Sequence, residues 1–134
     1  MKLQVSTDYA VRILQYLHIN GGQLHVAANI AESVGVTYPF FVQIANQLKK
    51  RGLLASAQGR NGGYQLSRPA HEISLYDVFV SVEGELQISR CLGGGGPCSY
   101  GEVRKCRMHD GLRDLQDTMI AEMSALSLVD MIDR

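Results

Sequence analysis

The sequence has no tryptophan, only three cysteines and no run of about 18 apolar residues among its 134 positions. We therefore expect no membrane-spanning helix. Residues 1–8 contain no apolar stretch of the kind found in secretory leaders, so a cytoplasmic protein is expected. Because cytoplasmic thiols usually stay reduced, three cysteines indicate metal or redox chemistry rather than a disulfide framework.

Catalytic motifs are also missing. No nucleophile and base stand together in a recognisable motif, and the glycines do not form a phosphate-binding loop. The sequence therefore gives no indication of an enzyme, and we expect a protein that acts by binding rather than by catalysis.

The formal net charge is +0, which by itself argues against a nucleic-acid partner. The charge is unevenly distributed, however. Residues 1–70 carry seven basic and two acidic side chains, a net charge of +5, whereas residues 71–134 carry six basic and eleven acidic ones, a net charge of −5. Such a split indicates a basic binding half followed by a second half with another role.

Apolar spacing predicts a mainly helical chain with one small β-hairpin. The expected elements are helices over 8–19, 26–33, 38–50, 75–82 and 108–126, and strands over 53–57 and 64–66. Ser6 or Thr7 can cap the first helix, Thr37 the third and Ser74 the fourth. The side chains expected to face inward in the second and third helices are Val26 and Ile30, then Phe41, Ile44, Ala45 and Leu48.

Three helices followed by a hairpin with a glycine-rich tip follow the order of a winged helix-turn-helix. We therefore predict a winged DNA-binding domain over 1–83, a cysteine-bearing loop over 84–107, and a long helix with a short apolar tail over 108–134. The predicted fold class is mainly α with a small β-hairpin wing.

In such a fold the third helix reads base edges in the major groove. Gln43 is the best single candidate, because its amide can pair with both adenine groups. Lys49 and Lys50 could reach phosphates, and Arg60 at the hairpin tip could contact phosphate or enter a minor groove. The full set of predicted DNA-binding residues is Thr37, Tyr38, Phe40, Gln43, Asn46, Gln47, Lys49, Lys50 and Arg60.

Structural roles remain open for some of these residues. Lysines near a helix C-terminus also complement the helix dipole, so Lys49 has a purely structural alternative. Tyr38 and Phe40 could instead be aromatic side chains at the edge of the core.

Three cysteines, Cys91, Cys98 and Cys106, have the spacing C-x6-C-x7-C. The absence of a C-x2-C pair argues against a zinc ribbon, whereas three thiolates suit an iron–sulfur cluster or a soft metal. The glycines at 93–96 would let the backbone approach an inorganic core closely. His109, three positions after Cys106, is the candidate fourth ligand. Three unlinked structural thiols are the alternative interpretation.

The sequence resembles the Rrf-two family of winged-helix regulators, in particular its iron–sulfur members of the IscR and NsrR types. The resemblance covers essentially the whole chain. The motifs that carry it are Met1-Lys2-Leu3, Thr7-Asp8-Tyr9-Ala10, Leu48-Lys49-Lys50-Arg51-Gly52-Leu53, Gly59-Arg60-Asn61-Gly62-Gly63-Tyr64-Gln65-Leu66 and the cysteine triplet. It implies a homodimer joined along the helix at 108–126, a palindromic DNA operator, and a 2Fe–2S cluster, or alternatively 4Fe–4S, on Cys91, Cys98 and Cys106.

The fourth ligand separates the two types. Cys106 and His109 resemble the IscR arrangement, whereas Asp8 stands where NsrR-type nitric oxide sensors can use a carboxylate from the other subunit. Asp8 also has a structural alternative, since the helix dipole favours an acidic residue in a first turn. The cysteine spacing is longer than usual for the IscR type. Val42 and Gln58 also replace an acidic base-reading residue and a wing arginine of many relatives.

These features predict a transcription regulator whose DNA binding is controlled by an iron–sulfur cluster that senses iron–sulfur status, oxidative stress or nitric oxide. One alternative is a cluster-free regulator of the same family in which Cys98 or Cys106 is oxidised directly. Another is a small iron–sulfur electron carrier, for which a basic N-terminal half would have no purpose.

Overall fold

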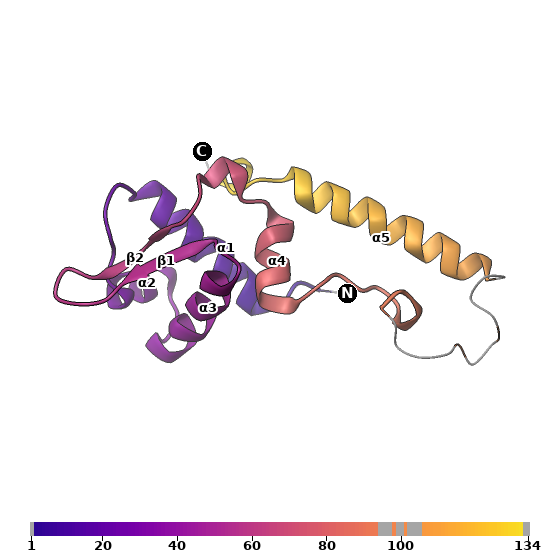
Figure 1. The fold of residues 1–134 in the computed structure, drawn as a ribbon, viewed down its shortest axis with the longest axis horizontal. Coiled ribbons are helices and arrows are strands. Elements are labelled where there is room, and N and C mark those ends of the chain that lie inside the picture. Colours follow the sequence, from indigo (N-terminus) through magenta and orange to yellow (C-terminus); the bar gives the residue numbers. More distant parts are fainter. Residues whose placement is uncertain (1, 94–97, 99–100, 102–105, 133–134) are drawn as a thin grey trace.

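The computed structural model describes residues 2–93, 98, 101 and 106–132. Five α-helices and one two-stranded sheet make up this part of the chain (Figure 1). In chain order the helices and strands are α1 Val5–Ile19, α2 Ala27–Val34, α3 Tyr38–Lys50, β1 Leu54–Ala57, β2 Gly63–Leu66, α4 Leu75–Glu83 and α5 Arg107–Ala125, with single-turn 3-10 helices η1 Ala70–Glu72, η2 Arg90–Leu92 and η4 Val129–Met131. This arrangement confirms the predicted mainly helical fold with a hairpin wing. Over the described residues, no helix is both long and apolar enough to span a membrane.

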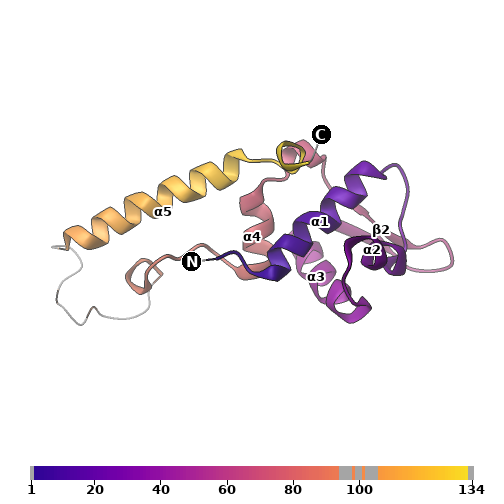
Figure 2. The same cartoon turned by 180° about the vertical axis from the view of Figure 1, so that it is seen from behind.

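The core lies between α1, α2, α3 and α4 (Figure 2). The predicted stripe of α3 is confirmed in full, because each of its four side chains is completely buried. The other fully buried apolar side chains are Ala10, Ile13 and Leu14 of α1, Ile30 of α2, Leu53 before β1, Ile73, Val78 of α4, and Leu128 near the end of the described chain. The core of the winged unit is therefore completed by a side chain from the end of the described chain, Leu128.

Local capping sets the bounds of α3 and α4. The Thr37 hydroxyl accepts a hydrogen bond from the Phe40 N–H at 3.3 Å, as predicted for the N-cap. Ser74 and Asp77 form a reciprocal capping box at the start of α4, with distances of 3.1 and 2.9 Å. Gly35 ends α2 with φ 86°, a left-handed conformation that favours glycine.

Two details of the predicted helices are wrong. The first helix begins at Val5, not residue 8, and neither Ser6 nor Thr7 caps it. Its N-cap is Gln4, whose side chain makes no capping hydrogen bond, and Thr7 is buried within the first turn. Val26 does not face inward either. It is the N-cap of α2 and 46% exposed, because the chain has not yet entered the helix there.

The wing is an antiparallel hairpin in which Leu54 pairs with Leu66 and Ala57 with Gly63. A third segment joins it at one point, where His25 and Tyr64 exchange backbone hydrogen bonds of 2.9 and 2.8 Å. This pairing needs glycine at position 63, since a Cβ there would stand 2.5 Å from the His25 carbonyl oxygen. Gly63 thus allows the hairpin to pair with the segment before α2.

The last helix, α5, projects away from the winged unit, and none of its residues is buried (Figure 1). The chain then returns to that unit. The Leu75 N–H donates to the Leu126 carbonyl at 2.7 Å, and the Leu128 N–H donates to the Ile73 carbonyl at 2.9 Å. Leu128 fills the core shared by α1 and α4. The division of the chain after residues 83 and 107 stays a prediction, and the structure adds that residues 126–131 pack on the winged unit.

Candidate DNA-binding surface and cysteine site

One side of α3 carries the polar residues predicted to read DNA. Thr37, Tyr38, Gln43, Asn46, Lys49 and Lys50 are exposed, and Phe40 and Gln47 are half-buried. The cause is the helical spacing of the four buried apolar residues, which turns the intervening side chains outward. The predicted residues of α3 therefore lie on the side of the helix opposite the buried stripe, and Lys49 and Lys50 are in its last turn.

The two aromatic residues at the start of α3 differ. Phe40 packs edge-on against Tyr9 of α1, with ring centroids 5.9 Å apart, so its ring belongs partly to the core. Tyr38 is 58% exposed. Burial and, to a smaller extent, the Tyr38 hydroxyl raise the pKa of the Tyr64 hydroxyl on strand β2 above its ordinary value of 10.0. Both hydroxyls therefore lie where α3 meets the wing.

Arg60 lies at the exposed tip between β1 and β2. Figure 1 shows this tip extending away from the core. A cation on such a tip can reach a phosphate or a minor groove beside the base pairs that α3 would read. Arg51 is the exposed C-cap of α3 and adds a positive charge beside Lys49 and Lys50 at the C-terminal end of that helix.

The three cysteines lie between α4 and the start of α5, and none is in a disulfide. Each is half-buried. Cys91 is in η2, with its sulfur 3.3 Å from the Ser89 hydroxyl. Cys106 is the N-cap of α5, where its sulfur accepts the His109 N–H at 3.4 Å. This capping contact explains why a cysteine and a histidine three positions apart come together.

The imidazole of His109 has an unsatisfied nitrogen. Its Nδ1 atom is buried and makes no hydrogen bond, a state shared in the described residues only by the Arg68 Nε. A buried nitrogen without a partner is costly unless something binds it, and neutral imidazole is a common metal ligand. The donor chemistry at the start of α5 therefore fits a thiophilic metal group.

The described residues do not gather a complete ligand set. No three Cys, His, Asp or Glu side chains among them lie close enough to hold a metal ion. Cys91 approaches α5 through η2, which packs against that helix, and the Ile88 N–H donates to the Gln116 side chain at 2.9 Å. Asp8 forms an exposed ion pair with Arg12 at 3.0 Å. The predicted glycines 94–96 lie outside the described residues.

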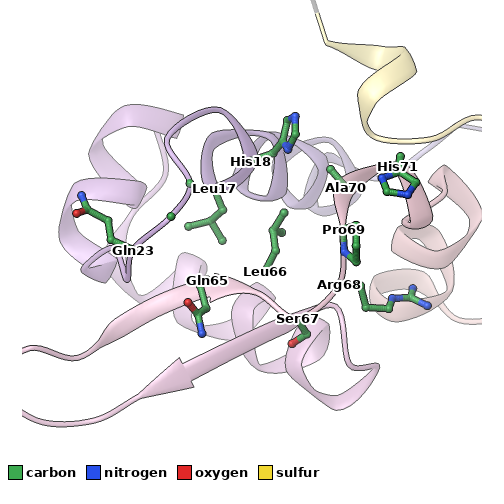
Figure 3. A pocket seen from close by; sticks show the side chains of 12 residues that line it. Leu17, His18, Gln23, Gln65, Leu66, Ser67, Arg68, Pro69, Ala70 and His71 are labelled. Atoms are coloured by element: carbon green, nitrogen blue, oxygen red, sulfur yellow. The ribbon is translucent and has the colours of Figure 1, made fainter.

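A pocket of about 560 Å³ lies between the end of α1, strand β2 and η1 (Figure 3). Its lining includes Leu17, Leu66 and Ala70, with His18 and His71 on different elements. None of the predicted DNA-binding or metal-binding residues lines it. The pocket is therefore separate from both candidate sites.

Residues 3–134 match the family model Rrf2, described as "Iron-dependent Transcriptional regulator". The chain belongs to the Rrf2 family. This confirms the predicted DNA-binding transcription regulator and, because the family is one of regulators, the expectation of no enzyme activity.

Rrf2 relatives match over nearly the whole chain. "Protein aau3" of Rhizobium meliloti (strain 1021) is 33% identical over 133 residues, covering 98% of this chain and 85% of the relative. The "HTH-type transcriptional regulator IscR" of Cronobacter sakazakii is 31% identical over 134 residues, covering 99% and 81%. The predicted resemblance to IscR-type Rrf2 proteins is therefore confirmed.

Two solved Rrf2 structures are similar in fold. "CymR (YrzC) the Global Cysteine Regulator of B. subtilis" superposes with a TM-score of 0.75 at 20% identity, covering 98% of this chain and 95% of that one. "T. potens IscR" superposes with a TM-score of 0.69 at 25% identity, covering 98% and 85%. These matches confirm the winged fold with its long C-terminal helix.

One contact between α1 and α4 was not predicted from the sequence. The Glu83 carboxylate at the end of α4 accepts hydrogen bonds from the Gln4 N–H and the Thr7 hydroxyl. The one signal in the sequence is the position of Glu83 in the last turn of α4. The helix dipole disfavours a carboxylate there, which indicates a contact with another element.

Proposed function

We propose that this Rrf2 protein is a cytoplasmic homodimeric regulator whose operator binding is controlled by an iron–sulfur cluster on Cys91, Cys98 and Cys106. His109 is the proposed fourth ligand. The observation that carries the proposal is the buried, unpartnered Nδ1 of His109, a residue whose backbone N–H donates to the Cys106 sulfur in the first turn of α5. A bound cluster would supply a centre that reacts with oxidants and nitric oxide.

Two other parts of the chain have roles in this proposal, one in DNA binding and one in dimer formation. The exposed face of α3 and Arg60 contact a palindromic operator, and the apolar residues of α5 join two copies of the chain. The ligand cysteines lie between α4 and α5, and their state sets the separation of the two α3 helices, which must be about 34 Å to read adjacent turns of one DNA face. Loss of the ligand contacts shifts the population toward copies with another spacing.

The test is anaerobic purification followed by a visible spectrum and counts of iron and sulfide for the parent, His109→Ala, Asp8→Ala and His71→Ala chains. We expect a coloured parent, loss of colour or a shifted spectrum for His109→Ala, and no change for His71→Ala, an exposed histidine outside the proposed site. A colourless parent without iron and sulfide after reconstitution would refute the proposal. A spectrum that changes for Asp8→Ala but not for His109→Ala would show that Asp8, not His109, is the fourth ligand.

A second candidate is a cluster-free thiol regulator. The absence of a gathered ligand set in the described residues favours it. The thiolate of Cys98 or Cys106 would attack hydrogen peroxide and break its O–O bond, so that the sulfur becomes a sulfenic acid and the other oxygen leaves as hydroxide, which takes a proton from solvent. Equal DNA affinity for Cys106→Ala and the iron-loaded parent, with a loss of affinity in the parent alone on addition of hydrogen peroxide, would establish this function instead.

A further inference from the structure

Helix α1 begins without a cap from its own sequence. The Gln4 side chain makes no capping bond, although the first turn of a helix leaves N–H groups without intrahelical partners. In a capping box, an acidic residue at the third helical position accepts the N-cap N–H. In α1 that third residue is Thr7, which has no carboxylate.

Glu83, the last residue of α4, supplies the missing carboxylate from 79 positions away. Its Oε2 atom accepts the Gln4 N–H at 3.2 Å and also accepts a short hydrogen bond from the Thr7 hydroxyl. Thr7 is 1% exposed and is the only fully buried polar side chain in the described part of the chain. Because water cannot replace the carboxylate there, the Thr7 hydroxyl depends on Glu83.

The position of Glu83 is unfavourable for its own helix. A carboxylate at a helix C-terminus opposes the helix dipole, and no basic residue in the last turn of α4 offsets it. At the N-terminus of α1 the same charge is favoured. The placement therefore stabilises the junction of α1 and α4 rather than α4 itself.

This junction adjoins the segment that leads to the cysteines. Gly84 follows Glu83 with φ 88°, and the chain turns toward η2 and Cys91. Figures 1 and 2 show the N-terminus beside this departing segment. On the other side, Thr7 is two residues from Tyr9, whose ring contacts Phe40 at the start of α3. One carboxylate thus lies between the cysteine segment and the helix predicted to read DNA.

We infer that Glu83 is a positioning residue that couples residues 84–92 to α1, and through the Tyr9–Phe40 contact to the DNA-reading end of α3. Its consequence for regulation rests on the proposed function, because it presupposes that the cysteine segment changes state. When that segment moves, Glu83 moves with it. The hydrogen bond from Thr7 to Glu83 then displaces the start of α1.

The first experiment needs no cluster. Amide hydrogen exchange is measured on the full chain for the parent, Thr7→Val, Glu83→Ala, Thr7→Ser and Glu85→Ala, the last being an exposed acidic neighbour. Thr7→Val should raise exchange about tenfold both in residues 4–9 and in residues 84–92, although the latter are distant in sequence. Thr7→Ser restores the hydroxyl and should keep the parent rates, as should Glu85→Ala. A rise confined to residues 4–9 would overturn the coupling.

The second experiment measures DNA affinity with and without the cluster, alongside iron and sulfide content. Glu83→Ala and Thr7→Val should keep the iron and sulfide content of the parent, while the ratio of the two affinities falls to about one. Thr7→Ser should keep the parent ratio. A parent ratio retained in Glu83→Ala would refute the regulatory role. A parent that itself shows a ratio of one would instead refute the proposed function, and the exchange experiment would still decide the coupling.

Discussion

The winged unit and α5 differ in how they bury apolar side chains. The core of α1, α2, α3 and α4 is closed, and four residues of α3 alone are fully buried. In contrast, α5 has 19 residues and none is buried, and its Leu115 is 53% exposed. An isolated helix gains most of its stability from packing one face against a partner. The winged unit therefore buries its apolar side chains within one chain, whereas the apolar side chains of α5 need a second surface to pack against.

The difference also shows how the two regions are tied together. The segment after α5 crosses back and places Leu128 in the closed core, while η2 packs against α5 and the Ile88 N–H donates to Gln116 in the middle of the helix. A helix supported at two places keeps its exposed face in a fixed orientation. We expect changes in the core to alter folding and changes on α5 to alter association.

The largest effect is expected from Leu128→Ala, which removes a fully buried side chain. The free energy of unfolding should fall by about 2–5 kcal/mol, the usual result for a large apolar residue truncated in a core. Urea denaturation followed by circular dichroism measures it. Val129→Ala is the matched control, because Val129 is 43% exposed, and it should change stability by about 0.5 kcal/mol or less. Equal losses for both variants would show that the tail does not belong to the core.

A charged side chain on α5 should weaken the proposed homodimer. Leu115→Asp places a carboxylate on the exposed apolar side of the helix, so the dimer dissociation constant should rise by about one hundredfold, or roughly 2.8 kcal/mol. Sedimentation equilibrium measures the constant. Asp117→Ala changes an exposed polar residue on the other side of α5 and should leave it unchanged. If Leu115→Asp associates like the parent, the dimer uses another surface.

On the winged unit, Gln43→Ala should weaken recognition of DNA rather than folding. The loss of a bidentate contact to adenine would reduce discrimination between the operator and a base-substituted duplex by about 1–3 kcal/mol. The operator is first selected from random duplexes with the parent chain, and affinities are compared at fixed salt. Gln65→Ala on β2, an exposed glutamine away from α3, is the control. Unchanged discrimination in Gln43→Ala would remove this residue from base readout.

The smallest effect concerns Tyr64, whose pKa is raised by burial and by Tyr38. A raised folded-state pKa means that the fold stabilises the neutral hydroxyl. This stabilisation is complete below the ordinary pKa of 10.0 and is lost as pH rises through the raised value. The stability of the parent should therefore fall more steeply than that of Tyr64→Phe as the pH rises above about 10 in urea titrations. Identical slopes would exclude a contribution from Tyr64 ionisation.

Local signals in the sequence were sufficient for α3 and α4. Thr37, Ser74 and the spacing from Phe41 to Leu48 act within a few residues of one another, and the structure contains the caps and the stripe as predicted. The start of α1 could not be predicted in this way, because its capping carboxylate comes from Glu83. The burial of Leu128 was equally hidden, since a short apolar turn after a helix has the same sequence pattern whether or not it packs back.

The candidate metal site was predicted only in part for a related reason. Cys106 and His109 are neighbours on one helical turn, so their proximity follows from the sequence. The approach of Cys91 depends on η2 packing against α5 and on the bond from Ile88 to Gln116. Contacts of that kind join residues 28 positions apart and leave no local pattern.

The return of Leu128 to the core has a consequence for synthesis of the protein. A chain emerging from the ribosome folds its N-terminal part first, yet here the core of that part stays incomplete until residue 128 has left the exit tunnel. The cysteine segment and α5 are therefore already outside the ribosome when the winged unit closes. Final folding of the DNA-binding unit thus comes after synthesis of the cysteine segment.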